Sequence, residues 1–281
     1  MPGAKNNTLK IDSRVTLADG NSMPLLGLGT WAAKAGGETR DAVANALETG
    51  YRHIDTAKMY GNERDVGEAV RESTVPRAEI FVTTKLWDND QGYDAALKAF
   101  DRSLEELGLD YVDLYLIHWP VETLRTDSWR ALERIKSDGM ARSIGVSNFS
   151  HIHLQALFST TDQRPAVNQI ELSPFLQQTP ISKFCRSHNI QLTGYCPLAK
   201  GQRFDDQTLS KIAAQKNKSP AQVMIRWALQ KGQAVIPKSS NPRRIGQNAD
   251  VFDFEISPDQ MARLDALDDD YRLCPDPLSM P

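Results

Sequence analysis

The stretch IFVTTKLWDNDQGYDAALKAFDRSLEELG, residues 80–108, predicts one strand followed by one helix. IFVTTK is a short and nearly continuous apolar run, which is typical of a strand that is covered on both faces. From about Tyr93, leucines and a phenylalanine recur at helical spacing, and Gly108 stands where a helix C-cap is expected. This order is that of a β/α unit in a parallel sheet.

The same order recurs along the chain, which has 281 residues. The apolar runs are LLGLG from Leu25, RHID from Arg52, IFVTTK from Ile80, VDLYLIH from Val112, SIGVSN from Ser143, AVNQIEL from Ala166, IQLTGY from Ile190 and QAVIPKS from Gln233. Two later helices carry clear start signals, because Ser219 and Ser257 are capping residues followed by proline and then glutamine. Eight β/α units within a length near the usual ~250 residues predict an α/β protein, a (β/α)8 TIM barrel.

The structural alternative is an open doubly wound sheet. Its dinucleotide fingerprint is missing, because GLGTWA from Gly27 does not match GxGxxG, and no Walker A or HExxH motif occurs. The segment VTLADGNSMP, with turn-forming residues at its centre, predicts an N-terminal β-hairpin that covers the bottom of the barrel. The chain ends in a short C-terminal tail, and without linkers or repeats we expect a single domain over residues 1–281.

Composition excludes several classes of partner. The net charge of −3 offers no basic field for nucleic acid or an anionic membrane surface. No apolar run approaches the ~20 residues of a membrane span, and the start MPGAKNNTLK lacks the apolar core of a signal peptide, so we expect a cytoplasmic protein. Cys185, Cys196 and Cys274 lack metal-ligand spacing, and we expect reduced, buried thiols and no metal site.

Titratable residues follow three of the predicted strands. Asp55 ends the second strand and Tyr60 lies in its loop, while Lys85 and His118 end the third and fourth strands. Active sites of TIM barrels lie at these carboxyl ends, so we expect the four side chains to meet at the mouth of the barrel. The structural alternative is a plain ion pair between Asp55 and Lys85 with a hydrogen-bonded histidine beside it.

The combination suits protonation of an alkoxide as it forms on a carbonyl oxygen. Tyrosine has an ordinary pKa of about 10, and we expect the Lys85 ammonium to lower the pKa of Tyr60 while Asp55 keeps that lysine charged. His118 would then donate a hydrogen bond that orients the carbonyl. A common nucleophile that produces such an alkoxide is the hydride of a reduced nicotinamide, so the site predicts a nicotinamide cofactor.

The segment IPKSSNPRRIGQN from Ile236 predicts an anion site after the eighth strand, where TIM barrels often bind phosphate. It gathers cations, hydroxyl groups and an expected helix N-terminus, contributed by Lys238, Ser239, Ser240, Arg243 and Arg244. The alternative is a solvated basic turn. Four residues at the ends of strands five to seven suit the rest of the cofactor, because amides pair with a carboxamide and a tyrosine ring stacks on a nicotinamide: Ser147, Asn148, Gln169 and Tyr195.

Several of these segments together resemble the aldo-keto reductases. The segments are GYRHIDTAKMYGNERDVG, GLGTW, TTKLW, LIHWP, GVSNF and IPKS...RRIGQN, and the likeness runs from about Leu25 to Leu267. NQIELSPF is most similar to the bacterial branch of 2,5-diketo-D-gluconic acid reductases, whose members also reduce methylglyoxal. The resemblance implies the barrel fold, a catalytic tetrad of Asp55, Tyr60, Lys85 and His118, and Tyr60 as the general acid.

The resemblance also implies a set of cofactor contacts. They are Thr30, Ser147, Asn148, Gln169, Tyr195, Leu198, Lys238, Ser239, Ser240, Arg244 and Asn248. Lys238 and Arg244 would face the 2′-phosphate, so the implied cofactor is NADPH/NADP+. The implied substrate-binding residues are Trp31, Trp87 and Trp119, with packing at the barrel rim as the alternative, whereas Trp129 and Trp227 fall on predicted helices and are expected in the core.

Some features depart from commoner forms of the family. Ser173 stands where many members have histidine, and the loop after HWP and the tail YRLCPDPLSMP are short. Short loops predict an open mouth, which favours small, hydrophilic dicarbonyls and sugar-derived ketones. Two other functions stay open, namely a nucleotide-binding regulatory module with slow turnover and a Schiff-base lyase that uses Lys85. The resemblance also implies a monomer.

Overall fold

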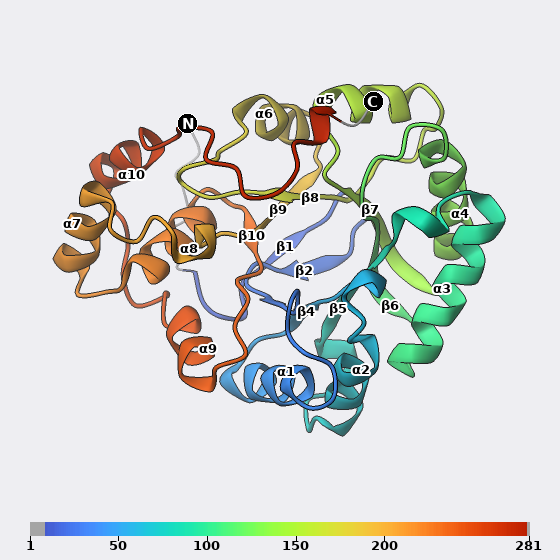
Figure 1. Ribbon diagram of the computed structural model, residues 1–281, viewed down its shortest axis with the longest axis horizontal. Coiled ribbons are helices and arrows are strands. Elements are labelled where there is room, and N and C mark those ends of the chain that lie inside the picture. Colours follow the sequence, from blue (N-terminus) through green and yellow to red (C-terminus); the bar gives the residue numbers. More distant parts are fainter. Residues whose placement is uncertain (1–8, 280–281) are drawn as a thin grey trace.

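The computed structural model describes residues 9–279, so most of the N-terminal segment inspected for a signal peptide lies outside the described residues. Eight parallel strands form the barrel, and Figure 1 shows the helices as a ring around them. The strands are β3 (Leu28–Gly29), β4 (His53–Asp55), β5 (Phe81–Leu86), β6 (Val112–Ile117), β7 (Ala141–Ser147), β8 (Val167–Glu171), β9 (Gln191–Tyr195) and β10 (Ala234–Val235). Each predicted apolar run overlaps one of them, which confirms the barrel expected from the sequence.

The first and last strands close the barrel. Parallel bridges join Leu26 to Val235 and Gly29 to Lys238, and the Leu25 carbonyl accepts a hydrogen bond of 2.8 Å from the Val235 N–H. Gly29 is required here, because a Cβ at this position would lie 2.8 Å from the Ile236 carbonyl oxygen. A side chain at this position would therefore force apart β3 and the chain after β10, where the barrel closes.

Ten α-helices cover the strands within the described residues. They are α1 (Glu38–Thr49), α2 (Glu63–Glu72), α3 (Tyr93–Leu107), α4 (Arg125–Ser137), α5 (His151–Phe158), α6 (Thr179–Ser187), α7 (Gln207–Lys216), α8 (Pro220–Gln230), α9 (Pro242–Ala249) and α10 (Pro258–Asp265). Gly108 caps α3 in the left-handed conformation, and Ser219 and Ser257 form capping boxes at the starts of α8 and α10. Trp129 on α4 and Trp227 on α8 are buried, so their prediction as core residues is confirmed.

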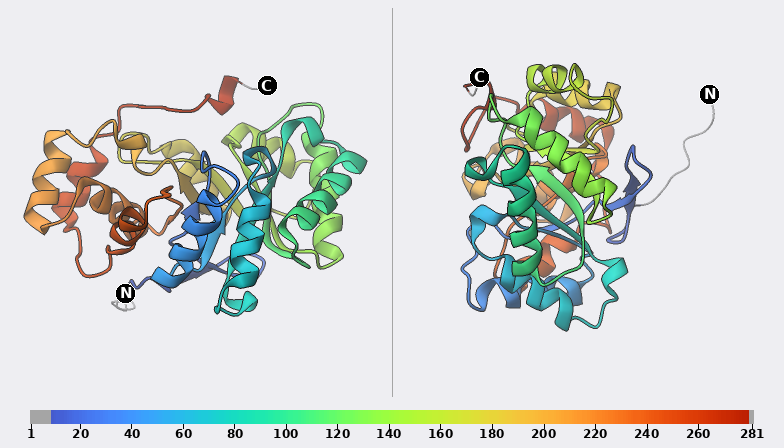
Figure 2. Two further views of the ribbon diagram at one scale, coloured as in Figure 1. Left: turned by 60° about the horizontal axis from the view of Figure 1, so that its bottom comes forward. Right: turned by 90° about the vertical axis from the view of Figure 1, so that its right-hand side faces the viewer.

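The predicted hairpin consists of β1 (Arg14–Thr16) and β2 (Ser22–Pro24), which pair antiparallel. It lies across the amino ends of the barrel strands, because Asn21 Nδ2 donates to the Arg142 carbonyl at 2.9 Å and Asp19 pairs with Lys136 at 3.0 Å. Figure 2 shows the hairpin and the C-terminal tail at opposite ends of the barrel. The bottom is thus closed by the hairpin, and the mouth is left to the loops and the tail.

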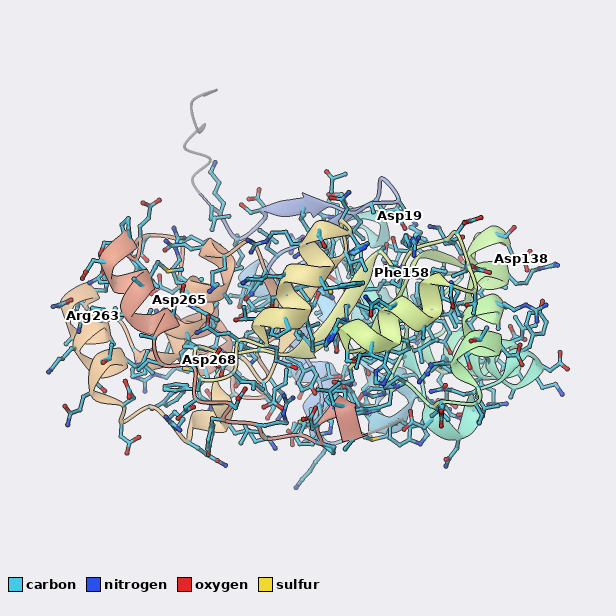
Figure 3. All side chains as sticks on the ribbon, turned by 90° about the horizontal axis from the view of Figure 1, so that it is seen from above. Asp19, Asp138, Phe158, Arg263, Asp265 and Asp268 are labelled. Carbon is cyan, nitrogen blue, oxygen red and sulfur yellow. The ribbon has the colours of Figure 1, made fainter. Side chains whose placement is uncertain are left out.

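The C-terminal helix is fixed to the barrel by two aspartates, which Figure 3 labels at the end of α10. Asp265 accepts a hydrogen bond of 2.7 Å from the Trp227 indole N–H, and Asp268 accepts one of 3.1 Å from the Gln177 backbone N–H. These contacts set the point from which the tail runs back toward the mouth. No helix in residues 9–279 is long and apolar enough to cross a membrane. The single domain over residues 1–281 stays a prediction.

Candidate active site

Asp55 and Lys85 form a buried ion pair inside the mouth of the barrel. Lys85 Nζ lies 2.6 Å from Asp55 Oδ1 and donates a second hydrogen bond of 2.7 Å to the Thr56 carbonyl. Neither side chain is more than 2% exposed. The second carboxylate oxygen, Asp55 Oδ2, accepts a hydrogen bond of 2.7 Å from Gln169 Nε2 on β8. Both oxygens of Asp55 are therefore held by donors, and the position of the Lys85 ammonium is set by the fold.

Tyr60 lies over this pair on the short 3-10 turn Lys58–Tyr60. Its hydroxyl oxygen is 3.3 Å from Lys85 Nζ. The expected lowering of its pKa is wrong: burial, followed by the negative charge of Asp55, holds the pKa of Tyr60 well above its ordinary value of about 10. Burial also lowers the pKa of Lys85, and Asp55 opposes that effect. Tyr60 is consequently a phenol at neutral pH, with the Lys85 ammonium next to the oxygen that becomes charged on proton loss.

His118 completes the group at the end of β6. Its ring centroid lies 5.8 Å from that of Tyr60 and 5.3 Å from that of Trp87, both in edge-to-face packing. Burial, and then the nearby Lys85 charge, holds the pKa of His118 well below 6.5. The imidazole is therefore neutral, and its buried Nδ1 has no hydrogen-bond partner among the described residues. A neutral ring beside a phenol can position a polar group of a bound molecule by hydrogen bonding.

The predicted amide cluster forms a chain of hydrogen bonds on the other side of the mouth. The Tyr195 hydroxyl donates to Asn148 Oδ1 at 2.8 Å, and Asn148 Nδ2 donates to the His118 carbonyl at 3.0 Å. Ser147 Oγ donates to the Gln169 carbonyl at 2.8 Å. The structure thus brings all four of these residues to the tetrad, and Gln169 reaches Asp55 itself. That contact was not predicted from the sequence.

Asn62, a residue that the sequence analysis did not predict, holds the loops of the first two β/α units together. Its Nδ2 donates hydrogen bonds to the Thr30 carbonyl at 3.0 Å and to the Ala33 carbonyl at 3.2 Å. Its Oδ1 accepts a hydrogen bond of 2.8 Å from Thr56 Oγ1. Asn62 occupies the N-cap position of α2, yet its side chain makes no cap hydrogen bond. The sequence does mark Asn62, because an asparagine directly before a helix is expected to be its N-cap. It does not predict the contacts of Asn62 with the loops, which form only when the chain folds.

The predicted anion site is open and charged. Asn241 caps α9, accepting a hydrogen bond of 3.1 Å from the Arg244 N–H. Lys238 lies 3.9 Å from Glu38 Oε1, and Ser240 holds the pKa of Glu38 below its ordinary value, with help from Lys238. The exposed Arg244 guanidinium makes no ion pair or hydrogen bond within residues 9–279. Ser239 and Asn248 are buried behind these cations, so the segment has donors available for an anion.

Comparison with known proteins decides what this site belongs to. Residues 25–269 match the model of the aldo/keto reductase family. The chain belongs to that family. It is 50% identical over 266 residues to the 9,11-endoperoxide prostaglandin H2 reductase of Trypanosoma cruzi, covering 94% of each chain. It is 47% identical over 277 residues to the glyoxal reductase of Bacillus subtilis, covering 99% of this chain and 98% of the relative.

A solved structure agrees with this assignment. The Bombyx mori aldo-keto reductase, crystallised in complex with NADP, superposes with a TM-score of 0.87 at 38% identity, covering 94% of this chain and 95% of that one. The protein is therefore an NAD(P)H-dependent oxidoreductase of the aldo-keto reductase class, and the resemblance seen in the sequence is confirmed.

The three tryptophans predicted for the substrate pocket lie on mouth loops of this aldo-keto reductase. Trp31 is 44% exposed and packs under the Lys200 ammonium, 4.9 Å from its ring centroid. Trp87 touches His118, and the backbone of Trp119 accepts a hydrogen bond of 2.7 Å from Gln91 Nε2. Trp87 and Trp119 are half-buried. Their roles stay predictions, as do those of Thr30, buried against Asp55, and Leu198, in the turn after β9.

Proposed function

We propose that this aldo-keto reductase uses NADPH to reduce small aldehydes and ketones to alcohols, with Tyr60 as the proton donor. One observation carries the proposal. The Tyr60 hydroxyl is held 3.3 Å from a buried ammonium, which is itself paired with Asp55, so a proton donor and the charge that stabilises its conjugate base are already in place. That arrangement matches the reduction of a carbonyl, in which a proton must reach the oxygen as negative charge develops there.

The described residues fit the implied cofactor. An anionic dinucleotide phosphate needs exposed cations, and Lys238 and Arg244 lie beside the capped N-terminus of α9 with no strong partner of their own. Toward the tetrad, Ser147, Asn148 and Gln169 offer amide and hydroxyl groups, and Tyr195 offers a ring. When bound, the reduced nicotinamide would supply a hydride to the carbonyl carbon.

Each tetrad residue has a separate task in the proposed reaction. Tyr60 transfers its hydroxyl proton to the carbonyl oxygen. Lys85 stabilises the resulting phenolate, and Asp55 keeps the ammonium oriented toward it. The neutral His118 side chain donates a hydrogen bond to the same carbonyl oxygen and so places the substrate. Since the pKa of Tyr60 is raised, the phenol is fully protonated across the neutral range and each encounter begins with the donor loaded.

The substrates we propose are dicarbonyls such as methylglyoxal and sugar-derived ketones such as 2,5-diketo-D-gluconate. The short loops support this proposal, because the segment between His118 and the start of α4 at Arg125 is short, and Trp31 on another mouth loop is 44% exposed. The likeness to a glyoxal reductase points to the same small carbonyls. The alternative is a regulatory module that binds NADP with little turnover.

The test follows the loss of NADPH absorbance with methylglyoxal, 2,5-diketogluconate, glyceraldehyde and a nitrobenzaldehyde, each repeated with NADH. We expect NADPH-dependent turnover that requires Tyr60, with the dicarbonyls among the better substrates. Tight NADPH binding without turnover on any carbonyl would favour the regulatory module. A covalent adduct on Lys85 after borohydride trapping with substrate would instead support a lyase and overturn the reductase.

A further inference from the structure

Two of the three cysteines lie side by side at the mouth of the barrel. Cys196 directly follows β9, and Cys274 lies in the C-terminal tail, 78 residues later in the chain. Glu171 lies opposite Tyr195 in the β8–β9 register and accepts a hydrogen bond of 3.0 Å from the Cys274 N–H, which places the Cys274 thiol against that of Cys196. Both are free and half-buried, whereas Cys185 on α6 is buried. The expectation of buried thiols is therefore right for Cys185 and wrong for this pair, which solvent can reach.

The tail is fastened to the barrel at Cys274 and in the residues before it. The Glu171 carboxylate at the end of β8 accepts hydrogen bonds from the backbone N–H groups of Leu273 and Cys274, at 2.8 and 3.0 Å. Arg203 pairs with Asp269 at 2.7 Å. Figure 1 shows the tail running from α10 back along the α6 side of the mouth. The tail at Cys274 and the turn after β9 are therefore held next to each other before any bond forms between the two sulfur atoms.

The contact between the two thiols shifts their pKa values in opposite directions. The hydrogen bond from Cys196 lowers the pKa of the Cys274 thiol, and the Lys200 ammonium acts in the same direction. That same contact with Cys274, together with burial, raises the pKa of Cys196. Cys274 is thus the thiol whose pKa is lowered, and thiolate is the form that reacts with oxidants and disulfides. The Glu171 carboxylate raises the pKa of both thiols and so opposes their ionisation.

We propose that Cys196 and Cys274 form a redox site that closes into an intramolecular disulfide in the presence of a peroxide. The Cys274 thiolate attacks one peroxide oxygen, the O–O bond breaks, and the other oxygen leaves as water after taking a proton, which gives a sulfenic acid. The Cys196 sulfur then attacks the Cys274 sulfur, the S–O bond breaks, and a second water leaves. Two thiols are oxidised by two electrons, and one peroxide is reduced to two waters.

Such a disulfide would tie the tail to the turn that carries part of the proposed cofactor site. Cys196 directly follows Tyr195, and Leu198 lies two residues further on. We expect the bond to restrict the movements of this turn, so that NADPH enters and leaves the oxidised protein severalfold more slowly. This consequence rests on the proposed function, whereas formation of the disulfide does not.

The chemical test treats the reduced full-length protein with hydrogen peroxide, alkylates the remaining thiols and maps the peptides by mass spectrometry without reduction. We expect a peptide pair linked through Cys196 and Cys274, one alkylated Cys185, and full reversal by dithiothreitol. Cys185→Ser is the matched control and should give the same link. Cys196→Ser should stop at a trapped sulfenic acid on Cys274. Peroxide treatment that leaves both thiols open to alkylation, or links either of them to Cys185, would overturn the proposal.

The functional test measures NADPH association and dissociation by stopped-flow fluorescence before and after oxidation. We expect both rates to fall in the wild type and the Cys185→Ser variant, and to be unaffected by peroxide in Cys274→Ser. A quantitative disulfide with unchanged rates would overturn the link to the cofactor. Absence of NADPH binding to the reduced protein would count against the proposed function, and the mass measurement would still decide the redox site.

Discussion

The two ends of the proposed cofactor site are built in opposite ways. At the tetrad end, Lys85 and Asp55 are paired at 2.6 Å and almost fully buried, and Gln169 occupies the remaining carboxylate oxygen. At the phosphate end, Lys238 and Glu38 are 3.9 Å apart with 33% and 36% of their side chains exposed, and Arg244 faces solvent. The charged side chains at the tetrad end are already paired within the protein. Those at the phosphate end would gain their strongest partners only from a bound anion.

The difference follows from what each end has to do. A group that stabilises charge during a reaction works best when it is already oriented in a dry site, because no reorganisation is then needed as the charge develops. A group that captures a soluble anion must be reachable from water, and its side chain gains its partner only on binding. We therefore expect substitutions in the buried Asp55–Lys85 pair to affect folding and turnover, and substitutions at the phosphate end to affect affinity alone.

The largest effect is expected from Lys85→Met. It leaves the Asp55 carboxylate buried without its counter-charge, which typically destabilises a protein by about 3–5 kcal/mol. Urea unfolding at pH 7 measures the loss, and activity should vanish with it. The double variant Asp55→Asn with Lys85→Met removes both charges and should recover part of the stability. A Lys85→Met protein as stable as the wild type would contradict a closed, preorganised tetrad.

Tyr60→Phe should come next, and it should separate chemistry from folding. It deletes the proton donor while leaving the ring in its packing against His118, so kcat should fall by about 10²–10⁴-fold with little change in NADPH affinity. Steady-state kinetics and cofactor fluorescence titration measure the two quantities. Tyr115→Phe is the matched control, since that buried hydroxyl on β6 has no partner within residues 9–279 and packs against Phe100. Equal losses in both variants would argue against Tyr60 as the donor.

Arg244→Ala tests the solvent-exposed phosphate end of the proposed cofactor site. Loss of a charge-assisted hydrogen bond of about 1.5–3 kcal/mol should weaken NADPH binding by about 10–150-fold and leave NADH binding and protein stability unchanged. Arg263→Ala removes the same charge from α10, which contributes no residue to the proposed anion site, and should alter neither affinity; Figure 3 labels Arg263. An unchanged preference for NADPH over NADH in Arg244→Ala would show that the 2′-phosphate is held elsewhere.

The smallest effect is expected from Glu38→Gln, which changes the phosphate end without removing a cation. Glu38 is the one carboxylate in ion-pair range of Lys238 in the described part of the chain, and an incoming phosphate must share that lysine with it. Removing its charge should tighten NADPH binding by less than about fivefold, because the pair is solvent-screened. Titrations at low and high salt measure the gain, which should shrink as salt rises. Weaker NADPH binding would show that Glu38 supports the site instead.

Much of the site was accessible from the sequence, because a parallel barrel brings the carboxyl ends of its strands to one face. Once the strand before Asp55 and the strand before Lys85 were recognised, their meeting followed from the fold class alone. The pKa of Tyr60 did not follow, since its sign depends on how far burial outweighs a neighbouring ammonium. Nor did the turning of Asn62 away from its helix, because the carbonyls that it binds belong to another β/α unit.

Local spacing along the chain was enough to predict the order of strands and helices, the caps, the family and the residue types at each strand end, because these depend on neighbours within a few positions. Which partners those residues take depends on how the elements pack in the folded chain. Gln169 reaches Asp55 across 114 positions, and Cys274 meets Cys196 only after the tail has crossed the mouth. The physical reason is that burial, pairing and accessible lone pairs are properties of the space between elements, which the spacing along a chain does not encode.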